Sequence, residues 1–275
     1  MSDLYMTVLS RLGVPDSVAK FRQTDFAGLT SVWRAPGAKY SYPPALIPLV
    51  SDQSGPCYYG YWKHWFVERE PTFVQMSINP DHAAFEIART PTQFVVRFVL
   101  ELVEITQGGS EKLRRFAESQ GIVDYEGLVA HWQSSGYTEG SLSMLPAFST
   151  KMPRGPKLPG PVGYDGSFPS WDFADKRPWW LTSCSMEIDA TVMDRWPSNI
   201  PAPDYLTEAN GFDLFEAYLE ARDLRSAWLS LNSAGWEVAE AQDAIEMLKA
   251  AAADPAFDLL ADAWVEAADR FRRGY

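Results

Sequence analysis

Several carboxylates lie close together in the sequence and could serve acid–base chemistry. The pairs are Glu68 with Glu70, Asp172 with Asp175, and Glu187 with Asp189. A glycoside hydrolase needs two carboxyl groups that face each other across a cleft. Glu187 and Asp189 would share one face of a strand, because side chains two residues apart do so. Acidic residues are abundant throughout this chain, so closeness in sequence does not select a catalytic pair, and we assign no catalytic residue.

The three histidines of the chain, His64, His82 and His131, have no spacing that would link them in a metal site. His64 lies between aromatic residues in WKHWF, where Glu68 or Glu86 could orient it as a general base. A structural or partner-facing histidine is the simpler interpretation. No metal ligand set is therefore predicted.

The two cysteines, Cys57 and Cys184, lie in unrelated contexts, which is typical of free thiols in a reducing compartment. The glycine-rich loops that bind phosphates are absent, and so is the GxSxG pattern of a nucleophile elbow. No cofactor is therefore predicted, and we interpret the chain as a binding protein.

The acidic charge of the chain is concentrated near its carboxyl end. The net charge is −12, and residues 201–275 hold fifteen Asp/Glu against six Lys/Arg, a net of −9. This sign argues against nucleic acid as a partner and favours attraction of a basic protein. We predict that Asp213, Glu216 and Glu220 bind such a partner; an acidic helix that only maintains solubility is the alternative.

Aromatic residues in a loop-like segment are the second candidate for partner binding. Trp171, Trp179 and Trp180 lie among Asp172 and Asp175 and other charged residues. Mixed aromatic and charged composition is typical of the anchors in protein interfaces. A loop folded back on its own domain has the same composition, so both interpretations stay open.

The segment 56–89 must provide the sheet that positions these groups. Residues 58–62 and 65–67 are aromatic and β-branched, 72–78 alternates in polarity, and 84–88 follows a turn signal. Before them, the segment ALIPLV is either a helix start or an extended entry to the sheet. Thr90 followed by Pro91 predicts a helix start, and the apolar face of the helix 91–106 should pack on the sheet.

The rest of the chain is predicted to form helices before and after a segment rich in proline and glycine. Helices are predicted at 111–120, with Ser110 as cap, and at 125–135. The Pro/Gly-rich segment 140–170 is predicted to be a linker or an extended loop. Three further helices follow: 212–231, 236–252 and one that starts after the cap Asp254, the last two as an antiparallel pair. The predicted domains are therefore 1–139, a linker at 140–170 and a mainly helical region at 171–275.

No uninterrupted apolar run approaches the roughly 20 residues that a membrane-spanning helix needs. The first residues lack the basic segment and apolar run of a signal peptide. A cytoplasmic protein with no membrane partner is therefore expected.

Four motifs resemble the SUKH superfamily over about residues 25–120. They are Tyr42-Pro43-Pro44 with Leu46-Ile47-Pro48, Ser51-Asp52 with Ser54-Gly55, Gly60-Tyr61-Trp62-Lys63-His64-Trp65, and Glu86-Ile87-Ala88-Arg89-Thr90. The resemblance implies an α+β fold with a curved antiparallel sheet flanked by helices. It also implies a relation to bacterial immunity proteins that neutralise toxins, and it supplies no shared catalytic set. The Pro/Gly-rich segment and the acidic helical region lie outside the usual pattern of this superfamily.

Together these features predict an α+β protein with an antiparallel β-sheet flanked by helices and an acidic helical region at its carboxyl end. The expected function is that of an immunity or inhibitor protein, which binds a basic toxin, such as a nuclease-type effector, and occludes its active site. The alternatives are a carboxylate-dependent glycoside hydrolase and a non-catalytic adaptor protein. No oligomeric state is predicted.

Overall fold

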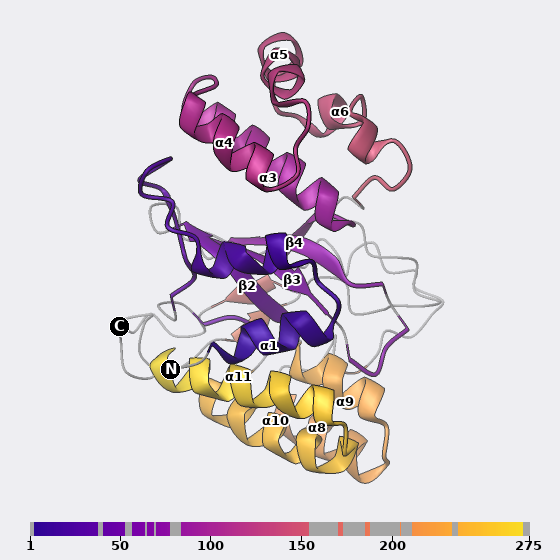
Figure 1. Cartoon of the computed structure of the whole chain (residues 1–275). Coiled ribbons are helices and arrows are strands. Elements are labelled where there is room, and N and C mark those ends of the chain that lie inside the picture. Colours follow the sequence, from indigo (N-terminus) through magenta and orange to yellow (C-terminus); the bar gives the residue numbers. More distant parts are fainter. Residues whose placement is uncertain are drawn as a thin grey trace, which may run out of the picture.

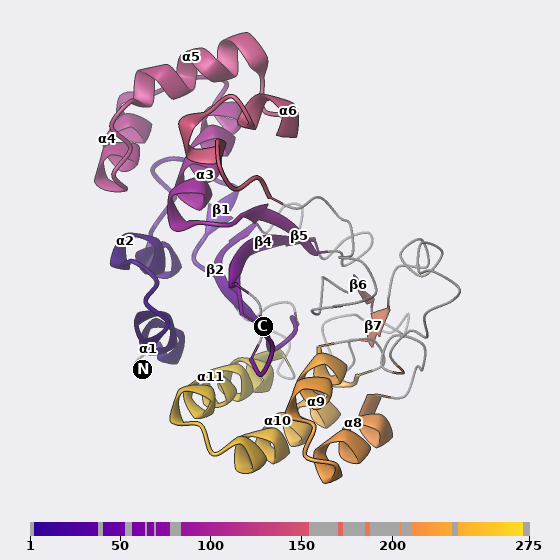
Figure 2. The ribbon, with the colours of Figure 1, turned by 90° about the vertical axis from the view of Figure 1, so that its right-hand side faces the viewer.

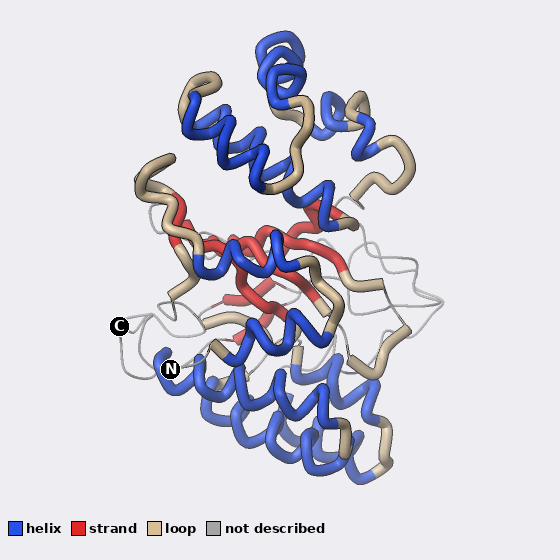
Figure 3. The backbone as a smooth tube through the Cα atoms, viewed as in Figure 1, coloured by secondary structure: helices blue, strands red, loops and turns tan. Residues whose placement is uncertain are grey.

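The computed structural model describes residues 3–37, 41–52, 57–63, 65–68, 70–77, 84–153, 170–172, 185–187, 204, 211–232 and 236–271. An antiparallel sheet with strand order β1-β2-β3-β4-β5 lies at its centre, between two groups of helices (Figures 1 and 3). Its strands are β1 (Trp33–Arg34), β2 (Leu46–Asp52), β3 (Cys57–Trp62), β4 (Thr72–Ser77) and β5 (Ala84–Ala88). The predicted α+β class is confirmed.

Each strand of the sheet pairs with the next one along the chain, and the sheet is strongly curved (Figure 2). ALIPLV enters β2, so the extended alternative is the correct one. The close approach of β2 and β3 requires Gly60, because a Cβ there would lie 2.5 Å from Leu46 Cδ1 and 2.6 Å from the Ile47 oxygen. The predicted strand at 65–67 is wrong: these residues form bends, and Phe66 has a φ of +59°.

One group of helices covers the sheet through α3 (Pro91–Ile105). The Thr90 side chain accepts a hydrogen bond from the Gln93 amide, which confirms the predicted cap. The apolar face of α3 then packs on the sheet, where the rings of Phe94 and Phe73 stack at a centroid distance of 4.8 Å. The group continues with α4 (Glu111–Ser119), α5 (Tyr125–Ser135), α6 (Glu139–Leu142) and η2 (Pro146–Phe148).

The second group contains helices from both ends of the chain (Figure 1). Its elements are α1 (Leu4–Arg11), α8 (Gly211–Glu220), α9 (Leu224–Leu231), α10 (Val238–Ala252) and α11 (Pro255–Phe271); α2 (Asp16–Ala19) and η1 (Lys20–Gln23) follow α1. The predicted single helix 212–231 is divided into α8 and α9, because Arg222 has a φ of +57° and Asp223 caps a new helix. The predicted antiparallel pair is confirmed: Gln242 contacts Asp269, and Lys249 contacts Asp262.

Residues far apart in the sequence join this second group to the sheet. The Asn232 side chain accepts a hydrogen bond of 2.8 Å from the Ala45 amide, just before β2. The indole of Trp264 on α11 donates to the Tyr42 carbonyl oxygen at 3.0 Å. Trp228 on α9, Trp264 on α11 and Trp236, just before α10, are buried, which confirms the prediction that they belong to the core. The carboxy-terminal helices therefore share a hydrophobic core with the first half of the chain.

The predicted linker lies mostly outside the described residues. Its first part, up to residue 153, contains η2 and packs against α3, where Gln93 Nε2 donates to the carbonyl oxygens of Ala147 (3.0 Å) and Lys151 (2.7 Å). Residues 154–169 are not described, so the boundary at 140–170 stays a prediction. None of the helices that the structure describes combines the length and hydrophobicity needed to cross a bilayer.

Candidate functional site

The residues predicted to bind a partner lie on two elements and in one undescribed segment. Trp171 and Asp172 belong to β6 (Ser170–Asp172), which pairs antiparallel with β7 (Ser185–Glu187). Asp175, Trp179 and Trp180 lie outside the described residues. The structure therefore shows only the backbone course of this candidate region.

Asp213, Glu216 and Glu220 lie along one stripe of α8, because their spacing of three and four residues matches the helical repeat. Asp213 and Glu220 are exposed, and Glu216 is half-buried. The opposite side of α8 buries Phe215 against Trp236 at a centroid distance of 5.7 Å. Burial of this apolar side directs the carboxylate stripe to solvent, which brings the three predicted residues together.

The stripe on α8 is one part of a larger acidic helical surface. This surface consists of ten exposed or half-buried carboxylates on three helices: Asp213, Glu216, Glu220, Glu240, Asp243, Glu246, Asp258, Asp262, Glu266 and Asp269. Lys249 pairs with Glu246 and Asp262, and Arg270 pairs with Glu266. The described residues of these three helices include only two Lys/Arg, Lys249 and Arg270, so the surface keeps a negative field.

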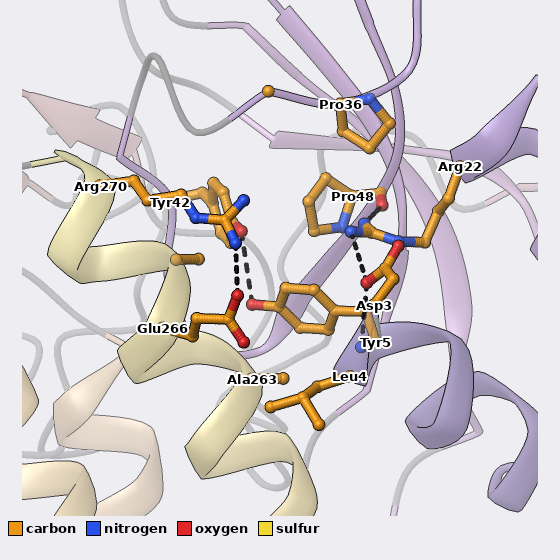
Figure 4. Close-up of a pocket in the computed structure, with 12 residues that line it drawn as sticks. Asp3, Leu4, Tyr5, Arg22, Pro36, Tyr42, Pro48, Ala263, Glu266 and Arg270 are labelled. Atoms are coloured by element: carbon orange, nitrogen blue, oxygen red, sulfur yellow. Dashed lines mark hydrogen bonds and ion pairs between the residues drawn. The ribbon is translucent and has the colours of Figure 1, made fainter. Parts of the chain in front are cut away.

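A cavity of about 370 Å³ lies between α1, α11 and β2 (Figure 4). Its residues come from the amino-terminal helical segment, from the strands and their connections, and from the last helix: Asp3, Leu4, Tyr5, Arg22, Pro36, Gly37, Tyr42, Pro48, Ala263, Glu266, Ala267 and Arg270. Figure 4 shows Arg22 and Asp3 on one side of the cavity and Arg270 and Glu266 on the other. Two ion pairs therefore frame this cavity from opposite sides.

The first ion pair is held by several bonds. Arg22 Nε lies 2.9 Å from Asp3 Oδ2, its Nη2 lies 3.2 Å from Oδ1, and Nη1 donates to the Pro48 carbonyl oxygen. The guanidinium also lies over the Tyr5 ring, 4.7 Å from its centroid. Asp3 has a second role as the cap of α1, since its side chain accepts from the Tyr5 amide. These contacts fix one wall of the cavity.

Two buried tyrosines form the base of the cavity. The hydroxyl oxygens of Tyr5 and Tyr42 are 3.4 Å apart. Burial raises the pKa of Tyr42 to about 12 and raises the pKa of Tyr5 as well. Both phenols therefore keep their protons at physiological pH and can donate hydrogen bonds.

The second ion pair, Arg270 with Glu266, lies on the last turns of α11 and is more open to solvent. The Arg270 side chain is 48% exposed and that of Glu266 is 36% exposed, against 8% for Arg22. Asp3 and Glu266 thus face the cavity from opposite sides, as a glycosidase pair would. Each is bound to an arginine, however, whereas the two carboxyl groups of a glycosidase face the substrate.

A separate polar cluster lies between α3 and the sheet. The Tyr59 hydroxyl donates to Glu101 Oε1 at 2.7 Å, and Arg97 Nε donates to the Tyr137 hydroxyl at 3.0 Å. Burial raises the pKa of Glu101 to about 7. Burial also raises the pKa of the Cys57 thiol, which keeps it protonated and confirms the prediction of a buried free thiol. This thiol is not poised as a nucleophile.

The remaining candidates for chemistry are not brought together. His131 lies half-buried on α5, while His64, His82 and Cys184 lie outside the described residues. Across the described part of the chain, no three side chains of the His, Cys, Asp and Glu types cluster as metal ligands do.

Comparison of the chain with protein-family models, with curated proteins and with solved structures found no match.

The cavity was not predicted from the sequence. Its lining comes from separate parts of the sequence, at residues 3–5, 22, 36–37, 42, 48 and 263–270, and no motif connects Asp3 with Arg270. The one local signal is Asp3 itself, a capping residue before a helix. The acidic helical surface was predicted in part, because charge spacing along a helix is visible in the sequence.

Proposed function

We propose that this protein is an immunity or inhibitor protein that binds a basic bacterial toxin and blocks access to the toxin's active site. The observation that carries the proposal is the acidic helical surface, on which ten carboxylates lie around two cations. A surface of one charge sign accelerates association with a protein of the opposite sign. The proposed site of action is the cytoplasm.

Two further observations support this proposal. The antiparallel, curved sheet flanked by helices is the fold that the resemblance to the SUKH superfamily implies. The helices of the acidic helical surface are held to the segment before β2 by Trp264 on α11 and by Asn232 at the end of the neighbouring α9. A partner would therefore meet preorganised charges, which lowers the entropic penalty of binding.

The proposal assigns different roles to the two candidate regions. Carboxylates such as Asp213 and Glu220 would speed the encounter, since exposed charges act mainly on the association rate. Trp171, Trp179 and Trp180 would slow dissociation, because buried aromatic anchors dominate the stability of interfaces.

A charge-reversal experiment tests the proposal. The probe is the toxin encoded beside this gene in the native host, and the variant carries Asp213→Lys, Glu216→Lys and Glu220→Lys on α8. A matched control carries Glu111→Lys, Glu118→Lys and Glu126→Lys on α4 and α5, which lie at the opposite end of the molecule (Figure 1). Both variants change the net charge equally, so a difference between them depends on position.

We expect the α8 variant to slow association at least about tenfold at low salt, and the control to change it by less than about threefold. The rate for the wild type should fall as salt rises, because the Debye length shortens from about 10 Å at 0.1 M to about 3 Å at 1 M. Equal slowing in both variants, or a rate that salt leaves unchanged, would contradict the steering role. Binding that leaves the toxin fully active would indicate an adaptor and not an inhibitor.

A further inference from the structure

The cavity between α1 and α11 differs from the acidic helical surface because its charges balance: two arginines face two carboxylates. We propose that this cavity binds a small zwitterion that carries one carboxylate and one ammonium group, as a free amino acid does. The inference does not rest on the proposed toxin binding, although Glu266 and Arg270 belong both to the cavity and to the acidic helical surface.

The carboxylate of the ligand is assigned to Arg270. Arg22 already uses three nitrogen atoms on Asp3 and the Pro48 carbonyl oxygen, and only 8% of its side chain is exposed. Arg270 is 48% exposed and holds only Glu266, four residues earlier on the same helix. Exposed pairs of this kind contribute little to stability and open readily. A guanidinium released in this way can bind a carboxylate through two parallel hydrogen bonds.

The ammonium group of the ligand is assigned to Glu266. When Arg270 turns to a ligand carboxylate, Glu266 loses its partner and needs a new cation near the cavity. An ammonium group on the same ligand provides that cation and restores the charge balance. A ligand with only one charged group would form one of these two ion pairs, whereas a zwitterion forms both.

The base of the cavity adds neutral hydrogen bonds. The hydroxyl oxygens of Tyr5 and Tyr42 are 3.4 Å apart, well beyond the usual 2.7–2.8 Å for an O–H···O bond. The long distance shows that the hydrogen bond between the two hydroxyls is weak, so exchanging it for a bond to a ligand oxygen costs little free energy. Because burial raises the pKa of both phenols, they remain donors throughout the physiological range.

The rest of the lining is apolar and limits the size of the ligand. It consists of Leu4, Pro36, Pro48, Ala263 and Ala267. A volume of about 370 Å³ lies near the lower end of the roughly 300–1,000 Å³ typical of small-molecule sites. An amino acid with a short aliphatic side chain fits this combination of a charged rim and an apolar wall.

Thermal unfolding and calorimetry with L-leucine and L-valine as probes test the inference. We expect both amino acids to raise the melting temperature, because a ligand that contacts α1 and α11 stabilises the folded state. N-acetyl-leucine lacks the ammonium group and leucinamide lacks the carboxylate, so neither should raise it. The variants Arg270→Ala and Glu266→Gln should each weaken L-leucine binding at least about tenfold.

Lys249→Ala is the matched control, because it removes an exposed ion pair between α10 and α11 outside the cavity lining. It should leave the dissociation constant unchanged. Far-ultraviolet circular dichroism verifies that each variant is folded. The inference fails if neither amino acid raises the melting temperature of the wild type, if the blocked derivatives bind as well as L-leucine, or if Arg270→Ala and Lys249→Ala have equal effects.

Discussion

The hydroxyl of Tyr59 on β3 donates a hydrogen bond of 2.7 Å to the carboxylate of Glu101 on α3. The pKa of Glu101 is raised to about 7, mainly by burial, and the charge of Asp52 acts in the same direction. The Tyr59 hydrogen bond and the positive charge of Arg97 act in the opposite direction. Desolvation is the largest of these effects, so the folded protein binds the proton of Glu101 more tightly than the unfolded chain does.

Glu101→Gln is expected to change the pH dependence of stability. The pKa of Glu101 rises from 4.5 to about 7 on folding, so its stabilising effect is fully present below pH 4.5 and is lost as the pH rises to 7. The variant should therefore be more stable than the wild type at pH 8, by about 2–3 kcal/mol, and similar to it at pH 4. Urea unfolding of both proteins at the two pH values measures this difference, and an identical difference at both would contradict the assignment.

Trp65→Phe should destabilise the contact between the β3–β4 connection and α11. The Trp65 indole donates to Asp254 Oδ2 at 3.0 Å, and this hydrogen bond lowers the pKa of Asp254. The phenylalanine ring preserves packing against Phe257 but removes the donor, so the free energy of unfolding should fall by about 1–2 kcal/mol. Trp132→Phe is the control, because its indole donates to Glu104 at an exposed position. If the free energy of unfolding fell equally in the two variants, burial of the Trp65 hydrogen bond would make no contribution to stability.

Gly60→Ala is expected to be strongly destabilising, because the new Cβ would lie 2.6 Å from the Ile47 carbonyl oxygen in the neighbouring strand. Backbone atoms of β2 cannot move aside as a flexible side chain can. We expect a loss of about 3 kcal/mol or more in the free energy of unfolding. Gly28→Ala serves as the comparison, since its Cβ would meet no atom within 4 Å. If chemical unfolding gave similar values for both variants, the close approach of β2 and β3 would not be the cause.

Ala253→Gly is expected to stabilise the protein. Ala253 ends α10 in the left-handed conformation, with φ +48° and ψ +39°, which glycine adopts without the strain of a Cβ. The expected gain is about 1 kcal/mol. Ala250→Gly, at an exposed position inside the same helix, should instead lower the free energy of unfolding by about 1 kcal/mol. Melting temperatures that move in the same direction for both variants would refute this explanation.

Elements with a local signal could be predicted from the sequence. Thr90 and Ser110 cap their helices through hydrogen bonds to residues three positions later, so the capping signal and the bond lie within one turn. Asp254 followed by Pro255 marks the start of α11 in the same way. Such signals depend only on residues that are close in sequence, so they can be recognised without knowledge of the tertiary structure.

Elements that depend on distant contacts could not be predicted. Residues 65–67 have the composition of a strand, but Phe66 adopts a positive φ and packs its ring against Trp228 and Phe257. The cavity also depends on distant contacts, because Arg22 and Arg270 face it from opposite sides only after α1 and α11 come together. The stripe on α8 was predicted because helical periodicity alone places its three carboxylates on one side.

The packing of α1 against α11 has a consequence for synthesis of the chain. During translation, α1 leaves the ribosome more than two hundred residues before α11. Until α11 is made, Tyr5 and Tyr42 lack the opposite wall of the cavity, which Ala263 and Ala267 form. A nascent chain would therefore expose an aromatic surface of the kind that chaperones recognise until α11 packs on α1.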